Sequence, residues 1–299
     1  CLLLQAARVD SERVIDNEPA EEVASVAQTR EAILRRANRT AVPLRRAFVQ
    51  KPRSLVTEDS PERSGPLAWF VTTKNHRALH AYLFVLAATS SGGGAAGWST
   101  THPIRVWARA FGTTETAEPT SASNAVSKLL GKLEDRALIS RQRRGRERVI
   151  QVTLKREDGL GDDYTRPDGK LAADRFLKLP HEFWLDGWLD KLKLPGLAML
   201  LVALSEKHGF QMPTEKMPQW YGWSADTAER GLAELENLGI LRKVRNRRVE
   251  PLSASGFGII NTYYLQPPFG PAPPALDGDT AADPTATTTP SDAAQEQPA

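Results

Sequence analysis

The chain has 299 residues, of which 40% are hydrophobic and 25% are charged. This is the composition of a soluble globular protein, and the length suits two domains. Of the 36 acids, five follow Gln266 with no base among them, so residues 1–266 carry 39 bases against 31 acids, a net charge of +8. A basic body fits a polyanionic partner, and the acidic tail can screen the positive charge of the body.

Cysteine content and hydropathy limit the cellular compartments in which the chain is expected. Cys1 is the only cysteine, so no disulfide can form within the chain, and we expect a reducing, cytoplasmic and nucleoid-associated location. No run approaches the ~18 apolar residues that a membrane span needs, so we expect no membrane partner; an anchor attached through Cys1 is the alternative. A chain that starts with Cys1 in place of Met is expected to be a fragment or a processed form.

Residues 1–66 are predicted to form an N-terminal helix and a linker. The helix is expected over about 19–39, with acids at its start and arginines at its end, as the helix dipole favours. Because its remaining surface is polar, we expect it to be loosely attached; a dimerisation arm or a DNA-contacting arm is the alternative. Residues 51–66 contain three prolines and many polar groups, which is typical of a linker.

The first domain is predicted over 67–156. A helix that opens near Asn75 buries Leu79, Tyr82, Leu83 and Leu86, and a second helix covers 103–111. The Gly-rich loop over 90–97 lacks the Gly-Lys-Ser/Thr ending of a phosphate-binding loop. His76 and His80 have helical spacing, but no third ligand with zinc-site spacing follows.

The most informative stretch is 121–154. A helix capped by Ser121 or Ser123 buries Val126, Leu129, Leu130 and Leu133, and its other face offers base or phosphate contacts from Ser123, Asn124, Ser127 and Lys128. An extended run then leads into a basic turn over 141–148, and 149–154 suits a returning strand. The cations of this turn, suited to phosphates, are Arg141, Arg143, Arg144, Arg146 and Arg148.

Residues 157–174 are predicted to be a Gly- and Asp-rich linker without the spacing of a calcium loop. The second domain, over 175–268, has a helix that starts at Pro195, a short helix over 213–221 and a helix capped by Ser224. A second basic turn over 242–248 and a return strand over 259–265 follow. Residues 269–299, acidic and rich in Pro, Ala and Thr, are expected to be disordered.

The two domains form an internal repeat. Leu133 and Glu134 match Leu235 and Glu236 at an offset of 102 positions. The same offset places Lys128 on Arg230, Arg141 on Lys243 and Arg143 on Arg245, and it aligns the apolar positions around them. A repeat of this size indicates two domains. The predicted fold class is mainly α with small β-wings (α+β).

Each half resembles the winged helix-turn-helix of bacterial MarR- and GntR-type regulators, in which a Ser/Thr-capped helix, a Leu-x-x-Leu-Glu-x-x-Gly-Leu-Ile run and a basic wing follow one another. Here the run is 130–139 and 232–241, with Ala137 where Gly is usual. The tandem arrangement resembles plasmid and phage replication initiators, and 220–230 is similar to proteins of actinobacterial mobile elements. The resemblance covers about 67–268.

The resemblance implies that the third helix of each half enters the major groove and that the wing contacts the backbone or minor groove. In the second half the helix carries acids that repel phosphates, so a protein-facing or dimerising role stands beside DNA contact. Its DNA-contacting residues would be Thr227, Arg230, Arg242, Lys243, Arg245, Arg247 and Arg248.

We therefore expect a sequence-specific protein that binds double-stranded DNA, either a transcriptional regulator or a replication initiator of a plasmid- or phage-like element. The alternative is a tandem winged-helix scaffold that binds proteins, of the chromosome-partition or replisome-loading type. No catalytic motif is found, so we expect no enzyme activity, no cofactor and no metal. A homodimer and replication or transcription proteins are the further expected partners.

Overall fold

The computed structural model describes residues 23–53, 62–89, 97–115, 117–145 and 148–271. In the first half, three helices and three strands follow one another in the order helix, strand, helix, helix, strand, strand. They are α3 (His76–Ala88), β2 (Ser99–Pro103), α4 (Ile104–Ala110), α5 (Pro119–Asp135), β3 (Ile139–Arg144) and β4 (Val149–Leu154). The sheet is antiparallel and has the strand order β2-β4-β3, because the β3–β4 hairpin folds back to place β4 between its neighbours.

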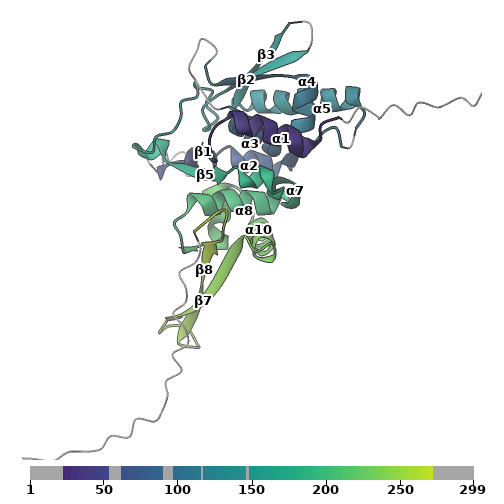
Figure 1. Ribbon diagram of the computed structural model, residues 1–299. Helices are drawn as coiled ribbons and strands as arrows, with labels where there is room; N and C mark the ends of the chain where they lie inside the picture. Colours follow the sequence, from purple (N-terminus) through teal and green to yellow (C-terminus); the bar gives the residue numbers. More distant parts are fainter. Residues whose placement is uncertain (1–22, 54–61, 90–96, 116, 146–147, 272–299) are drawn as a thin grey trace, which may run out of the picture.

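The second half repeats this order. Its elements are α8 (Leu194–Ser205), β6 (Phe210–Gln211), α9 (Met217–Tyr221), α10 (Ala225–Asn237), β7 (Leu241–Val249) and β8 (Phe257–Leu265). The sheet order, β6-β8-β7, corresponds to β2-β4-β3 of the first half. The fold is therefore mixed α/β with small antiparallel sheets, compatible with the α+β class that we expected. The hairpins β3–β4 and β7–β8 project from opposite ends of the molecule (Figure 1).

Helix α5 starts two to four residues before the serines that we expected to cap it. Pro119 occupies its first turn, where a missing N–H costs nothing. Ser121 and Ser123 therefore lie inside the helix. At the other end, Ala137 has a φ of 53°, a left-handed conformation that favours glycine. The second half has Gly239, with a φ of 70°, at the matching position.

The N-terminal segment is packed against the body, unlike the loosely attached helix that we expected. Helix α1 (Val26–Arg36) buries Thr29, Arg30, Ile33 and Leu34. The guanidinium of Arg30 donates to the carbonyl of Ala110 at 2.9 Å and forms an ion pair with Asp190 at 2.6 Å. Helix α1 thus joins α4 to the short helix α7 (Trp188–Lys191).

A two-stranded sheet lies between the halves (Figure 1), where it contacts α3 and α8, and short helices follow its strands along the chain. Strand β1 (Ala41–Arg45), in a segment for which we expected no strand, pairs antiparallel with β5 (Phe176–Pro180) (Figure 1). The short helices are η1 (Arg46–Phe48), α2 (Leu67–Thr72) and α6 (Glu182–Leu185). The buried hydrophobic side chains of both halves form one cluster, so the halves share a core.

A buried ion pair fixes the segment over 157–174, which we expected to be a linker. Arg45, at the end of β1, is fully buried and pairs with the fully buried Glu157. It also reaches Asp174 at 2.8 Å and Thr165 at 2.9 Å. Burial raises the pKa of the Glu157 carboxyl, and Arg45 opposes that shift. Such a charge is tolerated in a protein interior only when it is paired and hydrogen-bonded.

The last described residues also contact the core. Phe269 is buried, and its ring lies edge-on to Phe183 and Trp188. This differs from the expectation that disorder begins at residue 269. Residues 272–299 of the predicted disordered tail lie outside the described part of the chain.

Candidate nucleic-acid interface

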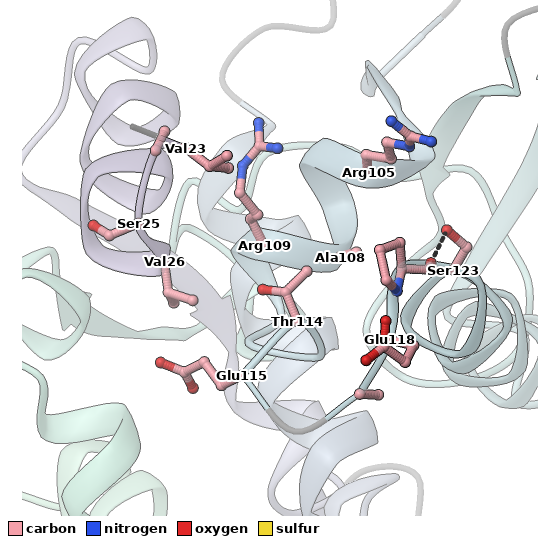
Figure 2. Close-up of a pocket in the computed structure, with 13 residues that line it drawn as sticks. Val23, Ser25, Val26, Arg105, Ala108, Arg109, Thr114, Glu115, Glu118 and Ser123 are labelled. Carbon is pink, nitrogen blue, oxygen red and sulfur yellow. Dashed lines mark hydrogen bonds between the residues drawn. The ribbon is translucent and has the colours of Figure 1, made fainter. Parts of the chain in front are cut away.

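The start of α5 presents a polar face, but its members are not equally available. Asn124 and Lys128 are exposed. Ser123 is only 7% exposed, and its hydroxyl donates to the carbonyl of Pro119 at 2.9 Å (Figure 2). The hydroxyl of half-buried Ser127 donates to the carbonyl of Ser123 at 3.2 Å. The two serine hydroxyls thus bond to the helix backbone, while Asn124 and Lys128 face solvent.

The basic residues that follow α5 lie mostly on a strand rather than in a turn. Arg141, Arg143 and Arg144 belong to β3, opposite Val152, Ile150 and Val149 of β4. Because side chains alternate along a strand, Arg141 and Arg143 share one face and Arg144 lies on the other. The exposed Arg148 immediately precedes β4. The predicted site residue Arg146 lies outside the described residues.

Arg141 joins the hairpin to helix α5. Its Nε donates to the carboxylate of Glu134 at 2.9 Å, and its Nη1 donates to the carbonyl of Ser127 at 2.6 Å. Its backbone N–H also donates to Glu134, at 3.1 Å. A Cβ added to Gly131 would lie 3.3 Å from the guanidinium, so glycine leaves room for this contact. In the described structure the guanidinium of Arg141 is therefore already hydrogen-bonded to groups of α5.

Arg144 is held on the other face of the hairpin. Its Nε donates to the side chain of Gln151, whose amide donates to Ser99 at 2.9 Å. These contacts fix Arg144 on the sheet face that Gln142 and Gln151 share. Arg143 and Arg148 are thus the described cations of the hairpin that do not bond to neighbouring side chains.

A pocket forms where α5 meets the hairpin. Its lining includes Ser123, Asn124 and Ser127 from the helix, with Arg143, Arg148 and two isoleucines, Ile104 and Ile150. A neighbouring hollow adds Arg105, the second residue of α4, together with Thr120 and Arg148. Among the described residues, no carboxylate forms an ion pair with Arg105, Arg143 or Arg148. Three arginines thus surround the polar end of α5.

Sequence reasoning missed Arg105. It lies in the first turn of α4, outside both basic turns, so only the packing of α4 on α5 brings it to this surface. Figure 2 shows Arg105 and Arg109 on the same side of α4, above Glu115 and Glu118 of the turn that leads to α5. These two acids line a further pocket, which Arg105 and Arg109 share with the start of α1, and mark the edge of the basic surface.

The corresponding surface of the second half is acidic. At the offset of 102, Asp226 replaces Asn124 and Glu229 replaces Ser127. Asp226 pairs with Arg230 at 2.9 Å, and Glu229 accepts from Thr214 at 3.0 Å. The Thr227 hydroxyl lies 3.0 Å from the Oγ of Ser224, the residue that caps α10. Two of the predicted contacts, Thr227 and Arg230, are therefore engaged within the helix.

The cations of the second half lie on its hairpin. The strands β7 and β8 have nine residues each, and the cations expected in a turn lie on β7. Arg242 lies over the ring of Tyr264, and Lys243 lies over Tyr263 and 3.8 Å from Glu236. This ion pair occupies the positions of Glu134 and Arg141 in the first half. The exposed members are Arg245, Arg247 and Arg248.

In the part of the chain that the structure describes, no helix combines the length and the apolar character that a bilayer crossing requires. Comparisons with protein-family models, with curated proteins and with solved structures found no match for this chain.

Proposed function

We propose that this chain binds double-stranded DNA in a sequence-specific manner and that its two halves are winged helix-turn-helix domains. The observation that carries the proposal is the convergence of Arg105, Arg143 and Arg148, none of them ion-paired among the described residues, at the start of α5. Arg143 and Arg148 share a pocket with Asn124, and Arg105 lines the neighbouring hollow with Arg148. We call Arg105, Asn124, Lys128, Arg143 and Arg148 the reading surface.

The chemistry of the reading surface matches a duplex. An α-helix fits the major groove, and an asparagine amide can both donate to and accept from the edge of adenine. Arginines around the helix suit phosphate oxygens, because their planar fork forms paired hydrogen bonds. Phosphate contacts position the helix, and Asn124 supplies base discrimination.

The second half is proposed to contact DNA through its hairpin rather than through α10. Asp226 and Glu229 would face phosphates if α10 entered a groove as α5 does, and like charges repel. On the hairpin, by contrast, the cross-strand partners of Arg245, Arg247 and Arg248 are uncharged. The acidic α10 favours a protein partner or a second copy of the chain, which keeps a role in assembly as the second candidate for this half.

We infer that the biological role is transcriptional regulation or replication initiation of a mobile element, in the cytoplasm and on the nucleoid. Selection from a random duplex library, followed by sequencing, tests sequence-specific binding. The full chain should enrich a defined motif, and Asn124→Ala should still bind duplexes but lose preference at one or two positions. Wild-type selection that enriches no motif would contradict the proposal. Capture of genomic DNA then separates an origin from a promoter.

A further inference from the structure

A second basic site lies at the junction of the two halves, away from the reading surface. It is a pocket lined by five cations, Arg46, Lys51, Arg53, Arg63 and Arg175, with one acid, Glu206. Three separate segments supply them. The backbone N–H of Arg46 donates to the carbonyl of Arg175 at 2.9 Å, and that of Lys51 donates to the carbonyl of Arg63 at 2.7 Å. Main-chain bonds therefore hold these segments together.

No described carboxylate compensates the charge of these cations through an ion pair. Among the described residues, none of the five forms an ion pair within 4.0 Å. The Nε atoms of Arg46 and Arg63 are buried without a hydrogen-bond partner, although Arg63 also donates to Gln50 at 2.9 Å. Burial and the neighbouring Arg53 lower the pKa of Arg63, the direction expected when cations are crowded.

The negative groups that the structure describes at the pocket do not balance this charge. Glu206 is exposed, and its carboxylate accepts from the hydroxyl of Tyr221 at 3.1 Å. Helix α8 ends at Ser205, and the carbonyl end of a helix amounts to about half a negative charge. A simple role in capping α8 would require one or two cations, whereas five line this pocket.

We propose that this pocket binds an anion with several phosphate groups, either the phosphate chain of a free nucleotide or adjacent phosphates of a nucleic acid backbone. Four of the five cations are arginines, whose forks bind two phosphate oxygens at once, while lysine acts as a point charge. A single carboxylate would leave most of this charge unbalanced. The bound anion would link three segments of the junction and so stabilise the folded chain.

Titration of the full chain with inorganic tripolyphosphate, at constant ionic strength in chloride, tests the proposal. We expect saturable binding by calorimetry and a rise in melting temperature. The variant K51Q/R175Q should bind at least about tenfold more weakly, since two contacts to a half-exposed site are lost. Substitution at these accessible positions leaves the partly buried Arg46 and Arg63 in place.

The matched control is R36Q/K178Q, which removes two exposed cations outside the pocket. It should bind tripolyphosphate like the wild type. Equal weakening in both variants would show general attraction to a basic protein and would overturn the proposal, as would the absence of saturable binding at millimolar concentrations. The melting temperature without ligand reports whether a variant is folded.

The source of the phosphates is identified by a second titration with a duplex. If K51Q/R175Q also flattens the salt dependence of duplex binding, the nucleic acid backbone occupies the pocket. If duplex binding is unchanged while tripolyphosphate binding is lost, the occupant is a free phosphorylated ligand. Both outcomes support the site. Because the tripolyphosphate assay needs no DNA, failure of the proposed DNA binding does not affect it.

Discussion

Substitution of Arg141 should show whether its side chain positions the hairpin or contacts phosphate. The side chain makes one hydrogen bond to Glu134 and one to the carbonyl of Ser127. The side chains of Arg141 and Glu134 are 33% and 38% exposed, so solvent screening reduces what each bond contributes. We expect Arg141→Ala to lower the free energy of unfolding by about 1–2 kcal/mol.

The effect on DNA binding should have a different form. Without Arg141 the β3–β4 hairpin loses its tie to α5, so Arg143 is no longer held beside Asn124 and duplex affinity should fall. Because Arg141 contacts Glu134 rather than phosphate, the dependence of affinity on salt should stay nearly unchanged. Arg143→Ala should instead flatten that dependence by about one unit and leave stability close to that of the wild type.

Urea unfolding and fluorescence anisotropy of a labelled duplex, measured over a range of salt, provide both quantities. The double variant Glu134→Gln, Arg141→Gln preserves the net charge of the pair and is the matched control. It should lose affinity as Arg141→Ala does, because the loss comes from position. If Arg141→Ala is as stable as the wild type and flattens the salt dependence as Arg143→Ala does, Arg141 contacts phosphate and the positioning role is wrong.

Three further predictions concern stability. Glu157→Ala leaves the buried Arg45 with a single carboxylate partner and should cost about 3–5 kcal/mol in urea unfolding; a cost below about 1 kcal/mol would contradict the importance of the pair. Ala137→Gly relieves a left-handed alanine and should stabilise the chain by about 1 kcal/mol, whereas a loss of stability would show that Ala137 is unstrained. Burial lowers the pKa of the His80 imidazole to about 2. Below about pH 6.5 the imidazole therefore takes up a proton in the unfolded chain but not in the folded chain. Stability from this group is present above pH 6.5 and lost as the pH falls, by about 2 kcal/mol at pH 5; His80→Gln should remove that loss, and an unchanged pH dependence would refute it.

The periodic elements of the fold could be predicted from the sequence. Helices with clear apolar spacing were expected close to their observed positions, as in α3 with its buried Leu79 and Tyr82. The offset of 102 also aligned residues that the structure shows to be equivalent, since Glu134–Arg141 and Glu236–Lys243 are both ion pairs. The spacing of residues within a segment determines these features, so the sequence of that segment alone is enough to predict each of them.

Features that depend on distant segments could not be predicted. Strand β1 forms because β5, more than 130 positions later, supplies its partner, and Glu157 is buried because Arg45 reaches it from β1. In the same way, packing of α4 on α5 brings Arg105 to the reading surface. Residue type alone likewise does not distinguish Arg141, which bonds to the helix, from Arg143, which does not; both lie on the same face of β3, and Arg141 is the one nearer to the end of α5.

The salt dependence of duplex affinity in Arg143→Ala, Arg148→Ala tests the central claim most directly. The wild type should bind its selected duplex at ~100 mM salt, and the double variant should bind more weakly with a dependence flattened by about two units. The control R36A/K178A, which removes two exposed cations that line neither pocket at the reading surface, should keep the wild-type dependence. A wild type that binds no duplex at this salt, or equal flattening in both variants, would contradict DNA binding through the reading surface.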